Sequence, residues 1–332
     1  MEDKIDIVLT WVDGNDPEWR KQKSEYELKI KGINKSSNNN VRFRDWDNLQ
    51  YIFRGIEKYM PWVNKIHFVT WGHLPKWLNV ECEKLNIVNH NDFIPKEYLP
   101  TFNSNTIELN LHRIPGLADR FINFNDDMFV IGETRKEDFF LHGLPMDMAV
   151  LSPAPCFRDV MCCIETNNLG IINDHFKITD IKRNKDKWYT PKYGKFLIRT
   201  ILFSKFKTIL GLFEPHIPFS YLKSVAIDLW NKEYEALDNT SKNKFRTRDD
   251  VNEWLFRHWQ LMSGQFEPRR WNFGILMSTE NTQDVVTLLK NPKKFKMICI
   301  NDSAAVDNFD ECKATINQAL QEIFPKKSIF EK

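Results

Sequence analysis

The chain has 332 residues, of which 42% are hydrophobic and 28% are charged, and its formal net charge is +2. This length accommodates one large domain or two modest ones, and the composition is ordinary for a globular protein. A charge so close to zero argues against electrostatic binding of nucleic acid by the molecule as a whole. We find no signal peptide and no apolar run near the ~20 residues needed to span a bilayer.

The six cysteines form no C-x-x-C pair, and two of them, Cys162 and Cys163, are adjacent. This spacing matches neither a zinc site nor a disulfide framework, so a reducing compartment fits it best. We therefore expect a cytoplasmic protein, at most peripheral at the inner face of the membrane.

The first 155 residues alternate between short apolar runs and helical patterns, which predicts an α/β domain. We expect strands at 6–12, 65–70, 85–88 and 120–124, helices at 47–59 and 103–111, and a loop around 31–40. Alternation of this kind indicates a Rossmann-like and mostly parallel sheet.

A polar cluster follows each expected strand. The clusters are Asp13/Asn15/Asp16, Gly72/His73, Asn89/His90/Asp92 and Asn125/Asp126/Asp127. Ligands of open α/β sheets bind beside the carboxyl ends of the strands, so four such clusters predict one polar crevice. The alternative is that these residue types simply mark loops.

Residues 156–332 change to helices and long connections. We expect a helix beginning at Asp249/Asp250, a buried strand at 296–300, and a closing amphipathic helix at 310–324. The sequence shows no clear linker between the two parts. We therefore expect the mainly helical part to pack onto residues 1–155, close over the crevice and complete one integrated catalytic unit.

Residues 177–207 are strongly basic and rich in aromatic and aliphatic side chains. They hold ten Lys or Arg against Asp180 and Asp186. The segment suits contact with an anionic membrane surface or with a polyanionic acceptor chain. A solvated basic face over a small core explains it equally well.

Three motifs contain residue types suited to phosphate chemistry. Asn125-Asp126-Asp127 follows a strand and could hold Mg²⁺ against a diphosphate, although helix capping explains most such pairs. Arg42/Arg44 and Arg246/Arg248 alternate so that both side chains of a pair share one face of an extended segment. The alternative for both pairs is ordinary surface arginine.

Pro215-His216-Ile217-Pro218 places an imidazole between two prolines, and His112-Arg113 stands beside Ile114-Pro115-Gly116. A stiffened histidine suits a general base, although a structural histidine is the commoner case. The sequence contains none of four common catalytic motifs: the P-loop, the dinucleotide fingerprint, the nucleophile elbow and the zinc-protease motif.

Taken together, these segments resemble the Stealth family, which includes bacterial capsular polysaccharide phosphotransferases and the animal GlcNAc-1-phosphotransferase. Four blocks carry the resemblance: residues 6–16; a long block from Arg42-Phe43-Arg44-Asp45 to Asn125-Asp126-Asp127; Pro215-His216-Ile217-Pro218 with Phe245-Arg246; and Ile300-Asn301-Asp302 with residues 325–331. The sequence departs from the family pattern at Trp46 and at Trp71.

The resemblance implies transfer of a hexose-1-phosphate from a UDP-sugar to a hydroxyl of a saccharide or growing capsular polysaccharide, with release of UMP, formation of a phosphodiester and dependence on Mg²⁺ (or Mn²⁺). It also implies a glycosyltransferase-like sheet, and it indicates Asp127, His216 and Arg246 as catalytic residues. The expected metal ligands are Asp126, Asp127, Asn301 and Asp302. The expected donor-binding residues are Asp13, Asn15, Arg42, Arg44, Asn105, His112 and Arg113.

Two other functions remain open on the residues alone. A metal-dependent glycosyltransferase would use the same Asp-Asp pair and release UDP. A non-catalytic polysaccharide-binding protein would need only the aromatic side chains and the basic segment.

Overall fold

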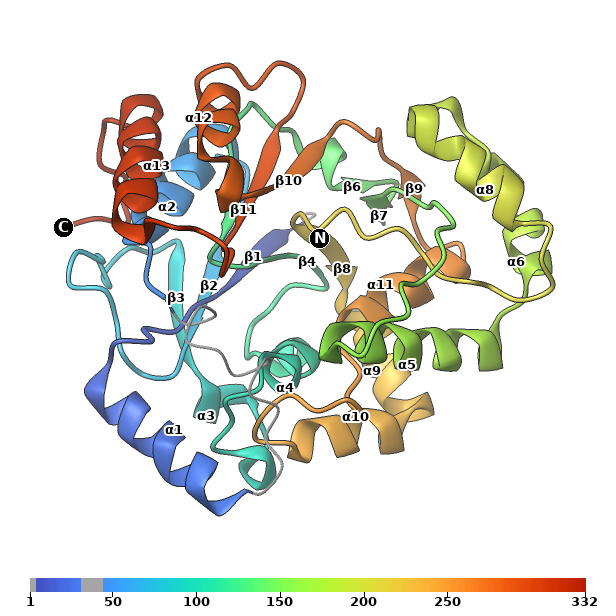
Figure 1. The fold of residues 1–332 in the computed structure, drawn as a ribbon, viewed down its shortest axis with the longest axis horizontal. Coiled ribbons are helices and arrows are strands. Elements are labelled where there is room, and N and C mark those ends of the chain that lie inside the picture. The colour runs from blue at the N-terminus through green and yellow to red at the C-terminus, as the bar shows by residue number, and fades with distance from the viewer. Residues whose placement is uncertain (1–3, 31–43) are drawn as a thin grey trace.

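The computed structural model describes residues 4–30 and 44–332 (Figure 1). Its largest sheet has five strands in the order β3-β2-β1-β4-β8, of which β3, β2, β1 and β4 are parallel and β8 is antiparallel to β4. The predicted α/β class with a mostly parallel sheet is confirmed. The strands of this sheet are β1 (Ile5–Thr10), β2 (Ile66–Thr70), β3 (Leu85–Asn89), β4 (Arg120–Phe124) and β8 (Phe219–Leu222).

The strands form where the sequence has short runs of β-branched and aromatic residues. Every residue of β2 is buried, and so are all residues of β1 except the last. Burial on both faces is characteristic of parallel strands covered by helices. The predicted strand at 120–124 coincides with β4, and the strands predicted at 6–12, 65–70 and 85–88 correspond to β1, β2 and β3.

Two small sheets flank the large one. One has the order β10-β11-β5, and the other has the order β6-β7-β9. The bounds of these strands are β5 (Met128–Val130), β6 (Phe140–Leu141), β7 (Leu144–Asp147), β9 (Glu267–Pro268), β10 (Gly274–Ser278) and β11 (Met297–Asn301). Because β11 pairs with β5, and β8 with β4, residues beyond 156 complete sheets that begin in the first 155.

The helices before residue 156 are α1 (Pro17–Lys29), α2 (Leu49–Tyr59), α3 (His90–Phe93) and α4 (Ser104–Leu109). Those after it are α5 (Val160–His175), α6 (Ile178–Arg183), α7 (Lys185–Trp188), α8 (Leu197–Phe203), α9 (Lys223–Lys232), α10 (Tyr234–Lys242), α11 (Trp254–Met262), α12 (Thr282–Lys290) and α13 (Phe309–Ile323). None of the helices in the described ranges is both long and apolar enough to cross a bilayer.

One helix start is wrong in the sequence prediction. The helix expected at Asp249/Asp250 begins only at Trp254. The carboxylate of Asp250 accepts hydrogen bonds from the side chains of Asn103, Asn105, Asn243 and Thr247. These bonds hold the segment in a loop, so Asp250 anchors α4 to this loop instead of capping a helix.

Candidate active site

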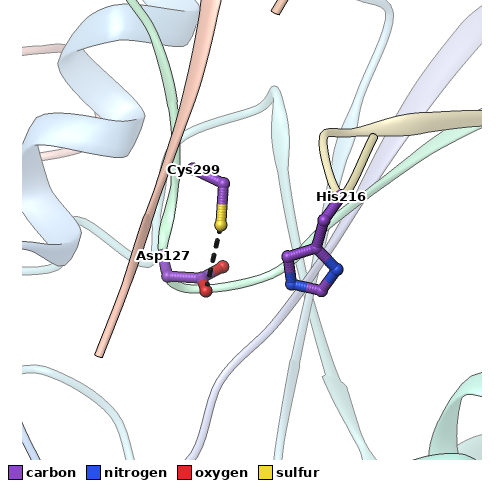
Figure 2. Close-up of side chains that lie close together, drawn as sticks. All are labelled: Asp127, His216 and Cys299. Carbon is purple, nitrogen blue, oxygen red and sulfur yellow. Dashed lines mark hydrogen bonds between the residues drawn. The ribbon is translucent and has the colours of Figure 1, made fainter. Parts of the chain in front are cut away.

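Asp127 lies in the tight turn between β4 and β5, at the carboxyl end of the parallel strands. The backbone N–H of Ile300 donates to the carbonyl of Asp127 at 2.9 Å, and Met128 pairs with Cys299 across the β5–β11 ladder. This register places the Cys299 thiol against the Asp127 carboxylate, with Sγ donating to Oδ2 at 3.2 Å (Figure 2). A distant strand therefore completes the turn that the sequence singled out.

His216 reaches the same place from the other side. Phe219, the first residue of β8, pairs with Asn123 of β4, so the chain just before β8 passes the turn that holds Asp127. His216 has a positive φ of 47°, an uncommon conformation for a residue with a side chain. Figure 2 shows its imidazole facing Asp127, and its ring packs edge-on against Trp254 at 6.1 Å. The flanking prolines thus belong to a strained loop that presents the imidazole.

The Asp127 carboxylate is incompletely satisfied. Its Oδ1 is buried and has no hydrogen-bond partner. Burial raises the pKa of Asp127, while the neighbouring His216 and the hydrogen bond from Cys299 act in the opposite direction. A buried polar atom without a partner costs free energy in the free protein, which points to a ligand that would satisfy it.

Asp127, His216 and Cys299 each offer one ligand atom, and these atoms lie within 4.8 Å of one another. We call these three residues the Asp127 cluster. Mg²⁺ commonly binds through one or two carboxylates, with substrate phosphates and water completing its shell, so the unpartnered Oδ1 of Asp127 fits one ligand position. Burial raises the pKa of the Cys299 thiol, which donates to Asp127 and so acts as a hydrogen-bond donor to it, not as a thiolate ligand.

Arg246 lies beside a second acidic group. Its guanidinium donates to the hydroxyl of Ser104, at the start of α4, and contacts the sulfur of Met161 at 3.3 Å. Among the residues that the structure describes, no carboxylate forms an ion pair with Arg246, although its charge lowers the pKa of Glu108. The guanidinium therefore keeps a positive charge that an anionic ligand could neutralise.

Glu108 and Glu253 form a buried carboxyl pair. Glu108 is on α4, Glu253 immediately precedes α11, and the two side chains are hydrogen-bonded to each other. Burial, then the charge of Glu253, raises the pKa of Glu108 well above its usual range, and Asp127 adds to the effect. Like charges this close cannot both be ionised at low cost, so the pair retains a proton.

Further carboxylates near Asp127 act on one another through their charges. The charge of Asp13, after β1, raises the pKa of Asp45, and the charge of Asp45 raises the pKa of Asp126. Burial is the largest cause of the raised pKa of Asp45. At Asp126, which is exposed, the charge of the adjacent Asp127 raises the pKa more than the charge of Asp45 does. Three of the predicted strand-end acids, Asp13, Asp126 and Asp127, therefore belong to one acidic region.

Three of the predicted metal ligands, Asp126, Asn301 and Asp302, do not join the Asp127 cluster. Both carboxylate oxygens of Asp302 accept from Arg44, at 2.6 and 2.9 Å, and Asn301 is exposed at the end of β11. Arg44 also stacks on Phe309 at 4.4 Å. Asp302 still acts on the cluster through its charge, because it raises the pKa of Asp127. Arg42 lies outside the described residues.

Asn15, His112 and Arg113 have other partners. Asn15 is exposed and accepts from Arg20 at 2.7 Å. The His112 ring packs on Trp230, burial lowers its pKa to about 3, and Arg113 lies over the same indole at 4.7 Å while donating to Asn110. These contacts explain the positions of His112 and Arg113 through packing alone.

Asn105 is buried, and its amide nitrogen donates to Asp250. Its Oδ1 has no partner, so one polar atom remains for a ligand. Of the residues expected to bind the donor, Asn105 retains an unpartnered oxygen and Asp13 belongs to the acidic region, so both suit contact with a ligand.

Two conserved regions of Stealth proteins match this sequence: region 1 (CR1) matches residues 3–31 and region 2 (CR2) matches residues 42–146. A capsular polysaccharide phosphotransferase of Streptococcus pneumoniae, WcwK, is 44% identical over 332 residues, which cover 99% of this chain and 98% of the relative. The chain belongs to the Stealth family.

Other Stealth relatives are similar over the full length. A receptor polysaccharide phosphotransferase of Streptococcus gordonii, WefC, is 39% identical and covers 100% of both chains. An exopolysaccharide phosphotransferase of Lactiplantibacillus plantarum, cps2G, is 36% identical, over 99% of this chain and 96% of the relative. Among solved structures, the galactosyltransferase LgtC is 11% identical with a TM-score of 0.38, over 97% of this chain and 96% of that one.

The matched Stealth regions contain Asp13 and Asp127 but neither His216 nor Arg246. Three residues of the site were missed by the sequence analysis: Cys299, Glu108 and Glu253. The sequence did contain a signal for Cys299, because this residue directly precedes Ile300-Asn301-Asp302, one of the four blocks that carry the resemblance to the Stealth family. The sequence offered no comparable signal for Glu108 and Glu253, because only the packing of α4 against the start of α11 brings them together.

Proposed function

We propose that this Stealth protein transfers a hexose-1-phosphate from a UDP-sugar to a saccharide hydroxyl, releases UMP and forms a phosphodiester in a capsular or surface polysaccharide. Full-length relatives named as polysaccharide phosphotransferases support the reaction class. The observation that carries the proposal is the proximity of Asp127 and His216, with Arg246, free of any ion pair to a described residue, beside Glu108.

In this reaction the acceptor oxygen attacks the phosphorus that bears the sugar. A new phosphorus–oxygen bond forms, the bond from that phosphorus to the oxygen bridging to UMP breaks, and UMP leaves with the electron pair. His216 takes the proton of the attacking hydroxyl, a role that its fixed position and its nearby carboxylate partner suit.

Arg246 binds the non-bridging oxygens of the transferred phosphoryl group. Phosphoryl transfer is accelerated mainly by positioning and by neutralising charge on these oxygens. Ser104 and Met161 hold the guanidinium without consuming its charge, whereas the charge of Arg44 is neutralised by Asp302. Arg246 is therefore better placed than Arg44 to bind an anionic substrate.

A divalent cation, Mg²⁺ or Mn²⁺, would be held by Asp127, and its chemistry would be to offset the negative charge of the diphosphate and of the leaving group. The neighbouring acidic residues Asp13, Asp45 and Asp126 would otherwise repel a nucleotide diphosphate. A cation in this region also reduces that repulsion.

The test is incubation of the purified protein with a panel of UDP-hexoses and a saccharide acceptor, with chromatographic identification of the released nucleotide. We expect UMP for one donor, and no release after treatment with EDTA until Mg²⁺ or Mn²⁺ is restored. Release of UDP would instead identify a glycosyltransferase. Binding of the polysaccharide without any nucleotide release would identify a non-catalytic binding protein.

A further inference from the structure

Helix α8 and the residues after it carry a cluster of exposed apolar side chains. Ile198, Ile201 and Leu202 are 61%, 46% and 50% exposed, and Phe206 is 52% exposed. Positions i, i+3 and i+4 share one face of a helix, so the first three project together. Exposed apolar side chains that cluster in this way mark an interaction surface.

The helix is fixed from its other side. Thr200 is fully buried and its hydroxyl accepts from the backbone N–H of Leu151, while the guanidinium of Arg199 lies over the rings of Phe196 and Phe213. The outward face of α8 is therefore a defined part of the fold. Figure 1 draws α8 and α6 together at one edge of the molecule, on the side away from α2 and α13.

Lysines surround these apolar side chains. A shallow groove between α6 and the end of α8 is lined by Lys177, Lys182, Ile201, Lys205, Phe206 and Lys207. All four of these lysines are exposed, and so is Lys195. Within the described ranges, none of the five forms an ion pair; the nearby Asp180 is paired with Arg183 at 2.7 Å. The surface is therefore positively charged as well as apolar.

We propose that this α8 surface, formed by Ile198, Ile201, Leu202 and Phe206 with the five lysines, binds the surface of an anionic lipid bilayer. An interface of anionic headgroups over acyl chains satisfies both features at once, because lysines contact the headgroups and aliphatic side chains enter the boundary below them. A polyanionic saccharide would account for the lysines but leave the four apolar side chains in water. The proposal is independent of the reaction catalysed.

The test is co-sedimentation of the full chain with vesicles of phosphatidylcholine alone or mixed with phosphatidylglycerol. We expect binding only to the mixed vesicles, weakened by salt. Changing Lys205→Glu and Lys207→Glu together should weaken binding about 20-fold or more, since each lysine near an anionic surface contributes about fivefold. Changing Ile198→Ser, Leu202→Ser and Phe206→Ser together should weaken it about tenfold or more.

The matched control combines Leu276→Ser and Lys326→Glu, an exposed apolar residue and an exposed lysine away from α8, and it should bind as the wild type does. Failure of the wild-type protein to bind mixed vesicles would overturn the proposal. So would binding to heparin, a soluble polyanion, that needs the lysines but not the apolar side chains, in the absence of vesicle binding. A dimer in sedimentation velocity that the triple serine change dissociates, again without vesicle binding, would show that the surface binds a second copy.

Discussion

Two buried ionic clusters in this protein are built on opposite principles. In the first, Arg257 donates five hydrogen bonds, to both oxygens of Asp147, to Glu214, and to the carbonyls of Phe213 and Met148. All five donors of the guanidinium are satisfied, and Arg257 lowers the pKa of Asp147. In the second, the region of Asp127, Glu108 and Glu253, acidic groups lie close together and buried oxygens lack partners.

The difference distinguishes a cluster that stabilises the fold from a region whose unpartnered groups support the proposed ligand site. The Arg257 cluster joins β7, α11 and the segment that leads to His216, so its satisfied bonds fix the loop on which the imidazole stands. In the acidic region, carboxyl groups lie close together and buried oxygens have no hydrogen-bond partner. A bound cation and a bound phosphate would offset these unfavourable contributions. Such groups are retained where a ligand binds and are costly elsewhere.

The largest effect is expected from Asp127→Asn. Removal of this charge should reduce the rate of transfer about a thousandfold while the thermal transition stays within a few degrees, because a carboxylate at a phosphoryl-transfer site acts mainly on the transition state. Steady-state kinetics and calorimetry measure the two quantities. The matched control is Asp228→Asn, whose exposed side chain pairs with Lys232 on α9 and should leave the rate unchanged. Equal activity of the two variants would remove Asp127 from the mechanism.

Arg257→Met should lower the stability of the protein, whereas Asp127→Asn should lower the rate of transfer. The loss of Arg257 leaves Asp147 and Glu214 buried without their counter-charge, which typically lowers the free energy of unfolding by about 3–5 kcal/mol. Urea denaturation measures the loss, and Arg248→Met is the control because Arg248 is exposed and donates to a single carbonyl. An Arg257→Met protein as stable as the wild type would contradict the structural role given to this cluster.

His216→Ala should lower kcat about a hundredfold if the imidazole accepts the proton. Because His216 has a positive φ, alanine also strains the loop, so His216→Asn serves as a second variant that tolerates this conformation. Both variants should lose about a hundredfold in kcat, and the asparagine variant should be the more stable. Full activity of His216→Asn would show that only the backbone conformation matters.

Glu108→Gln should have the smallest effect and should increase stability. The pKa of Glu108 is higher in the folded protein than in the unfolded chain. Below the unfolded pKa the carboxyl group is protonated in both states, so it does not affect the free energy of unfolding. As the pH rises towards the folded pKa, only the unfolded state loses the proton, and the free energy of unfolding falls. Glutamine is neutral throughout. We expect no difference in the free energy of unfolding at pH 4 and a gain of about 1 kcal/mol or more at pH 7. A gain that is the same at both pH values would contradict the buried carboxyl pair.

Local sequence pattern predicted the parallel sheet well. The alternation of apolar runs with turn residues gave β4 its bounds, and the polar residues after β1 and β4 were correctly expected at one edge of the sheet. These features depend on short stretches of chain and on the general geometry of parallel strands. For the same reason the helix at 310–324 was found to within one residue, as α13.

Contacts between distant segments could not be predicted in this way. Cys299 meets Asp127 only because β11 pairs with β5 in one register, and Asp250 anchors its loop to a distant segment because the side chains of Asn103 and Asn105 donate to it. Asp302 was expected to bind metal, yet its pairing with Arg44 depends on how two remote loops meet. Such partners are set by tertiary packing, which residue spacing does not encode.

The fate of the β-phosphorus of the donor tests the central claim most directly. A UDP-hexose labelled with ³²P in its β-phosphate would be incubated with the protein, Mg²⁺ and acceptor, and the saccharide would be separated from the nucleotides. Transfer of hexose-1-phosphate requires the label to enter the saccharide in stoichiometric amount with UMP, because the bond between the sugar and its phosphate stays intact. Retention of all the label in UDP, with unlabelled sugar in the product, would contradict the account.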